Sequence, residues 1–241
     1  MESKSFFIDS EEKISKHDLR NGMFMKELLG DEEYEINILP SVSDLEVDKR
    51  CKATFKLYGG NVSEILGTKK IKYMFLGSAP YMFDTQIYVE DGEVLPLIFH
   101  PDEFDKASYV FLGHELNHAL KDFNSSKVLV EDSVYDVIPF FYELMCAESE
   151  ENEKVKKEIY KRRIDLLQDE GFIKSISYYY ALALFEKYKG RDEILVLRLI
   201  SRVLNGEITT YDLLNMLGIY NTDLDYIVSR ELETIKQYIL S

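Results

Sequence analysis

The sequence predicts an α+β fold that is mainly helical, with a small N-terminal sheet followed by a C-terminal helical bundle. Between residues 52 and 99, short β-branched and aromatic runs alternate with Gly, Pro and Asn turn signals. From Pro101 almost to the end, apolar residues recur at helical spacing between single glycines. No Pro/Gly/Ser-rich linker divides the chain, so we expect one unit over 1–241 with lobes at 1–100 and 101–241.

The N-terminal lobe is expected to begin with a helix over Ser10–Leu29 that Gly30 ends. An Asp91-Gly92 turn between two apolar runs is typical of a hairpin. The expected strands are Ala53–Tyr58, Ile71–Leu76, Gln86–Glu90 and Val94–Phe99.

The C-terminal lobe is expected to open with a helix that Asp102 caps and that runs to about Phe123. A second helix is predicted to start near Asp136, with Pro139 in its first turn. Further helices are predicted over 152–169, 172–188, 192–204, 209–217 and 223–240.

The composition is that of a soluble protein with a net charge of −15. Such an acidic chain is a poor partner for nucleic-acid phosphates and for anionic membrane surfaces. Its two cysteines form no disulfide framework, Met1–Asp9 has no signal-peptide pattern, and the longest apolar run, Tyr178–Phe185, is too short to span a bilayer. We therefore expect a cytoplasmic protein with no nucleic-acid or membrane partner.

The motif that carries chemistry is His114-Glu115-Leu116-Asn117-His118. On a helix, residues four apart lie on one face, so His114 and His118 can hold one metal ion through two imidazoles. Glu115 then lies beside the site, where it can take a proton from a metal-activated water as general base. The alternative is a pair of solvated or capped histidines on a surface helix.

A catalytic zinc needs a third protein ligand and one open position. No histidine follows His118, so the ligand must be acidic. Glu143 is the best-placed candidate, because a lone carboxylate among aromatic and aliphatic neighbours needs a partner. Asp136 is an alternative ligand. Glu150, two turns after Glu143, is expected to orient a ligand histidine from behind, or else to be solvated.

These residues resemble the active site of the oligoendopeptidase F and thimet oligopeptidase family of zinc peptidases. The resemblance rests on the HExxH motif, on Glu143 and Glu150, and on C-terminal segments at Ser177–Ala181, Leu204–Gly206 and Asp212–Ile219. It implies a zincin-like catalytic domain with a cleft that accepts short peptides. It also implies tyrosines that stabilise the reacting carbonyl oxygen: Tyr180 as a catalytic residue, with Tyr178 or Tyr179 contacting substrate.

The sequence thus predicts a zinc-dependent peptidase that binds one Zn²⁺ ion and hydrolyses short peptides. Two imidazoles and a carboxylate suit zinc best, although another divalent metal stays open. The family usually has Gly at the position of Asn117 and often has His at that of Lys121. These departures keep a second hypothesis open, a non-catalytic metal-binding sensor or interaction domain. A purely structural helical protein is the third. The oligomeric state is not predicted.

Overall fold

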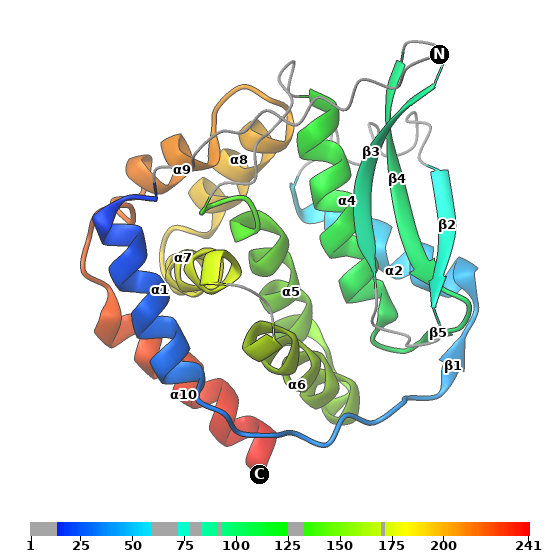
Figure 1. Cartoon of the computed structure of the whole chain (residues 1–241), viewed down its shortest axis with the longest axis horizontal. Coiled ribbons are helices and arrows are strands. Elements are labelled where there is room, and N and C mark those ends of the chain that lie inside the picture. The colour runs from blue at the N-terminus through cyan, green and yellow to red at the C-terminus, as the bar shows by residue number, and fades with distance from the viewer. Residues whose placement is uncertain (1–13, 59–71, 78–82, 91–92, 125–132, 170–171) are drawn as a thin grey trace, which may run out of the picture.

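The computed structural model describes residues 14–58, 72–77, 83–90, 93–124, 133–169 and 172–241 (Figure 1). It is mainly helical with a small sheet, which confirms the predicted fold class at that level. The helices are α1 (Lys16–Leu29), α2 (Asp44–Phe55), the 3-10 turn η1 (Lys56–Tyr58), α4 (Ser108–Asn124), α5 (Val137–Ser149), α6 (Glu153–Asp169), α7 (Phe172–Lys189), α8 (Glu193–Leu204), α9 (Thr210–Met216) and α10 (Asp225–Leu240). The strands are β1 (Ser41–Val42), β2 (Lys72–Gly77), β3 (Asp84–Glu90), β4 (Glu93–Pro101) and β5 (Phe104–Asp105).

The larger sheet has the strand order β2-β4-β3, with β2 parallel and β3 antiparallel to the central β4. Leu97 of β4 lies opposite both Lys72 and Gln86, which fixes the register on the two sides. The strands expected near residues 71, 86 and 94 are therefore confirmed. The turn predicted at Asp91-Gly92 lies outside the described residues.

The prediction of a strand over Ala53–Tyr58 is wrong, because this run continues α2 and then forms η1. The helix is begun by Ser43, whose hydroxyl accepts a hydrogen bond from the amide of Glu46 at 3.3 Å. A short apolar run cannot by itself distinguish a buried strand from the end of a buried helix.

The first helix of the C-terminal lobe starts later than predicted, at Ser108 instead of after Asp102. The residues between form β5, which pairs antiparallel with β1. Asp105 in β5 accepts hydrogen bonds from the amide of Leu39 and from the fully buried guanidinium of Arg162. A pairing between segments this far apart leaves no local signal in the sequence.

The elements are stacked in layers that place α4 and α5 at the centre of the molecule (Figure 1). The sheet packs on one side of α4, α5 packs on another, α7 follows α5, and α1 and α10 cover α7. Helices α4 and α5 approach closely at Gly113, where a Cβ atom would lie 2.2 Å from the ring of Tyr142. Within the described residues, no helix has both the length and the apolar character needed to cross a membrane.

Candidate metal centre

The two histidines of the motif lie one turn apart on α4 and face each other. Their ring centroids are 4.9 Å apart, and the two Nε2 atoms are 3.2 Å apart. Both side chains are buried, with 3% and 5% of the residue exposed for His114 and His118. The predicted convergence of the two imidazoles is therefore present.

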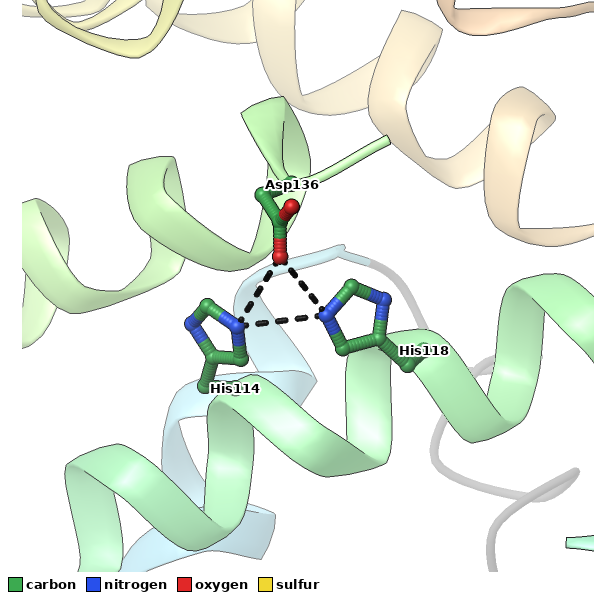
Figure 2. Close-up of side chains that lie close together, drawn as sticks. All are labelled: His114, His118 and Asp136. Atoms are coloured by element: carbon green, nitrogen blue, oxygen red, sulfur yellow. Dashed lines mark hydrogen bonds and ion pairs between the residues drawn. The ribbon is translucent and has the colours of Figure 1, made fainter. Parts of the chain in front are cut away.

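The third member of the cluster is Asp136, which precedes the first turn of α5 (Figure 2). Its Oδ1 atom lies 3.4 Å from Nε2 of His114 and 3.0 Å from Nε2 of His118. Asp136 is the N-cap residue of α5, yet its side chain caps no helix amide and is turned toward the histidines instead. These three buried side chains could hold a metal ion.

Glu143 does not join this cluster and lies behind His114 instead. Its Oε1 atom is 2.6 Å from Nδ1 of His114, on the far side of the ring from Asp136. Arg163 of α6 donates from Nε to Oε2 at 2.7 Å and from a terminal nitrogen to Oε1 at 2.6 Å. Among the described residues, the carboxylate that meets both Nε2 atoms is therefore that of Asp136, the alternative that the sequence left open, and not that of Glu143, whose two oxygens are engaged by His114 and Arg163.

The hydrogen bond that Nδ1 of His114 donates to Glu143 decides which nitrogen of the neutral ring faces the cluster with a lone pair. A neutral imidazole carries one N–H and one acceptor nitrogen. With a carboxylate on Nδ1, the proton is held there, and Nε2 is left as the acceptor that a metal requires. Glu143 thus takes the orienting role that the sequence analysis gave to Glu150.

The charges around His114 favour its protonated form in the metal-free protein. Burial opposes that charge, but the carboxylates of Glu143 and Asp136 outweigh it and raise the pKa of His114 to about 9. Burial likewise opposes the charge on Asp136, but hydrogen bonds from the two histidines hold its pKa well below the usual range. The pKa of Glu143 is lowered against burial by Arg163 and His114. Both carboxylates are therefore ionised at neutral pH.

The ring of His118 is held by aromatic packing, whereas that of His114 is held by a hydrogen bond. Its ring stacks on Tyr135 with centroids 4.4 Å apart and planes 13° apart. Its Nδ1 atom is buried and has no hydrogen-bond partner among the described residues. The stack fixes the plane in which the His118 nitrogens can meet an ion.

Glu115 is only half-buried, unlike the histidines on either side of it. Its negative charge contributes to the raised pKa of His114, which places it within electrostatic reach of the cluster. Its backbone carbonyl accepts a hydrogen bond from the Thr85 hydroxyl at 3.2 Å, which ties β3 to this turn of α4. None of the described residues forms a hydrogen bond or an ion pair with the Glu115 carboxylate.

The remaining predicted residues lie in other surroundings. Glu150 pairs with Arg50 and accepts a hydrogen bond from the Tyr109 hydroxyl at 3.2 Å, so it does not orient a ligand histidine. The Tyr180 hydroxyl is directed to α1, where it donates to Asp18 at 2.6 Å.

Tyr178 is buried and packs edge-on against Phe140, at a centroid distance of 5.3 Å. The hydroxyl of Tyr179 donates to Asp225 of α10. The oxyanion and substrate roles that the resemblance implied for these tyrosines therefore receive no support from their positions.

Sequence reasoning missed two residues that shape the centre, Arg163 and Tyr135. Arg163 lies in the Lys161-Arg162-Arg163 run of α6, which reads as an ordinary solvated helix face. Its burial, with 6% exposed, becomes evident only once α6 is packed against α5.

Comparisons with protein-family models, with curated proteins and with solved structures found no match to this chain.

Proposed function

We propose that this protein is a zinc-dependent peptidase in which His114, His118 and Asp136 hold the ion and Glu115 serves as general base. The observation that carries the proposal is the convergence of two Nε2 atoms and one carboxylate oxygen beside the glutamate of the motif. Three protein ligands with a free fourth position are typical of catalytic zinc sites.

The spacing of the three ligand atoms supports an ion of the size of zinc. Their separations of 3.2, 3.4 and 3.0 Å put the equidistant point about 1.9 Å from each atom, against zinc–ligand bonds of about 2.0–2.2 Å. A small displacement from the plane of the three atoms brings the distances into that range. Two imidazoles and one carboxylate also favour zinc over the harder cations calcium and magnesium.

The chain's own residues divide the remaining work between them. A zinc ion supplies Lewis acidity that lowers the pKa of a coordinated water and polarises a carbonyl. Glu143 keeps Nε2 of His114 directed at the centre. Glu115, half-buried and without a competing partner among the described residues, is the carboxylate able to accept and return a proton.

Peptides are the proposed substrate because the motif belongs to metalloproteases and because a strand edge lies beside it. Among the strands that the structure describes, β3 is an edge of its sheet, and Thr85 joins it to the backbone of Glu115. Extended peptides bind by adding a strand to such an edge.

The burial of the ligands favours a second candidate function, a metal-binding module without turnover. No more than 5% of His114, His118 or Asp136 is exposed, and the tyrosines expected to stabilise an oxyanion contact other groups. Structural zinc sites are closed in this way, whereas catalytic sites keep one open position.

The test compares wild type with Glu115→Gln, using Glu103→Gln at an exposed site on the same lobe as the matched control. Metal content is measured by elemental analysis after reconstitution with Zn²⁺, and cleavage is measured on a mixed peptide library. Zinc bound by all three proteins, with cleavage lost only in Glu115→Gln, supports the peptidase. Zinc without cleavage by wild type supports the binding module, and failure of wild type to bind zinc rejects both.

A further inference from the structure

Hydrogen bonds through serine hydroxyls connect the segment that carries Asp136 to two helices, α7 and α1. The amide of Asp136 donates to the Ser177 hydroxyl at 3.3 Å, and that hydroxyl donates to the carbonyl of Ser133 at 3.1 Å. The Ser133 hydroxyl in turn donates to Asp18 at 3.2 Å. This series of hydrogen bonds thus runs from Asp136 through Ser177 of α7 to Asp18 of α1.

Asp18 is an unusual anchor, because it is a buried carboxylate that only neutral groups hold in place. It is 1% exposed, and no cation pairs with it among the described residues. Instead it accepts hydrogen bonds from four hydroxyls, those of Ser15, Ser133, Tyr180 and Tyr220. A buried charge is expensive unless it is fully hydrogen-bonded, so this arrangement strongly fixes the position of each of its donors.

The turn that presents Asp136 is held by α5 and by this hydrogen-bond network together. The carbonyl of Asp136 accepts a hydrogen bond from the amide of Phe140 at 2.9 Å, but its side chain makes no capping bond to α5. Ser177 on α7 holds the amide of Asp136 and the carbonyl of Ser133, so it ties the two ends of the turn to each other. A shift of this turn would move Oδ1 away from the two Nε2 atoms.

We propose that Ser177 and Asp18 are positioning residues that hold Asp136 in place for metal binding, an inference that rests on the metal site of the proposed function. Neither residue contacts the two imidazoles or the carboxylate of the cluster. Each acts through the backbone of the segment that presents the carboxylate. Outer partners that orient metal ligands typically change metal affinity by about 10- to 100-fold when they are removed.

The experiment measures binding of Co²⁺ and Zn²⁺ to wild type, Ser177→Ala, Asp18→Asn and Ser175→Ala. Ser175 is the matched control because it lies on the same helix, is equally buried, and has a hydroxyl with no partner among the described residues. Affinity is read by competition with a chromophoric chelator. The visible spectrum of bound Co²⁺ reports the geometry of its ligands, which a general loss of stability would not alter. Circular dichroism of the metal-free proteins confirms that each variant is folded.

We expect Ser177→Ala and Asp18→Asn to lose about 10- to 100-fold in affinity and to change the Co²⁺ spectrum, while Ser175→Ala behaves as wild type. If wild type binds metal and both variants match it, the positioning role is refuted and the metal site stands. An equal loss in Ser175→Ala also refutes it, since any cavity in α7 would then suffice. A wild type that binds neither metal refutes the positioning role and the proposed function together.

Discussion

Replacing Glu143 by Gln should weaken metal binding although it removes no ligand of the ion. The substitution keeps the size of the side chain but withdraws the negative charge from Nδ1 of His114, 2.6 Å away. A less basic imidazole with a less firmly held ring is a poorer ligand. The effect on the ion is therefore transmitted entirely through His114.

The size of the effect follows from the hydrogen bond and from the electrostatics of the ring. The pKa of His114 is raised to about 9 from 6.5, which corresponds to about 3 kcal/mol of interaction shared between Glu143 and Asp136 after burial has opposed it. Loss of one such partner is expected to lower metal affinity by about 10- to 100-fold, or about 1.4–2.8 kcal/mol. Glu143 also favours a proton on His114, and that proton competes with the metal. The metal affinities of wild type and Glu143→Gln should therefore be compared above pH ~9, where this competition ends.

Arg163 complicates this substitution, because it is itself buried and would lose the carboxylate charge of Glu143. Breaking a buried ion pair by removing one charge costs about 3–5 kcal/mol of folding stability. The double variant Glu143→Gln/Arg163→Met removes the arginine charge as well. This double variant should therefore recover much of the lost stability, but its metal affinity should stay as low as that of Glu143→Gln.

The assay is chelator competition for Zn²⁺ combined with urea unfolding of the metal-free proteins. Glu150→Gln is the control, since Glu150 directly follows the same helix as its C-cap residue but contacts Arg50 and Tyr109 instead of His114. The reasoning is refuted if Glu143→Gln binds Zn²⁺ as tightly as Glu150→Gln. It is also refuted if the double variant regains wild-type affinity, because the loss would then come from the arginine whose carboxylate partner was neutralised.

Four further outcomes are expected. His114 has a folded-state pKa above its unfolded value, so its charge stabilises the metal-free protein fully below pH 6.5. Up to about 3 kcal/mol should be lost as the pH rises through about 9, which urea unfolding at the two extremes measures. Over the same range metal affinity should rise by about tenfold per pH unit and then level off, because each bound ion displaces that proton; a flat profile by chelator competition would contradict this. Asp105→Asn should destabilise the protein by about 3–5 kcal/mol, since it removes the charge that pairs with the buried Arg162, and a urea midpoint close to wild type would be the contrary result. Gly113→Ala should force α4 away from Tyr142 and lower both the thermal midpoint and metal affinity, whereas an unchanged Co²⁺ spectrum would show that the helices tolerate the extra methyl.

Local patterns in the sequence were sufficient for the parts of the site that lie within one helix. His114 and His118 are four residues apart, so their approach depends only on helical geometry. The start of α4 was placed too early, because β5 depends on pairing with β1 from the other end of the lobe. The C-terminal helices were placed within a few residues, since their periodicity and glycines are local signals.

The carboxylate that meets the two imidazoles could not be predicted in the same way. Choosing between Asp136 and Glu143 requires the rotation of α5 relative to α4 and the position of Arg163 on α6. The argument that a buried carboxylate needs a partner was correct for Glu143, but the partners are an arginine and the back of an imidazole. Burial alone indicates that a charge is compensated and leaves open what compensates it.

Because His118 stacks on Tyr135, the two imidazole rings differ in rotational freedom in the metal-free protein. Rotating the His114 ring by half a turn would break its bond to Glu143, so that ring has one preferred direction. Face-to-face contact with Tyr135 survives a half-turn of the His118 ring almost unchanged, and the unpartnered Nδ1 offers no resistance. Among the described residues, the contacts of Nε2 with Asp136 and with Nε2 of His114 select the direction of His118. Loss of the aspartate should therefore loosen the orientation of the His118 ring more than that of the His114 ring.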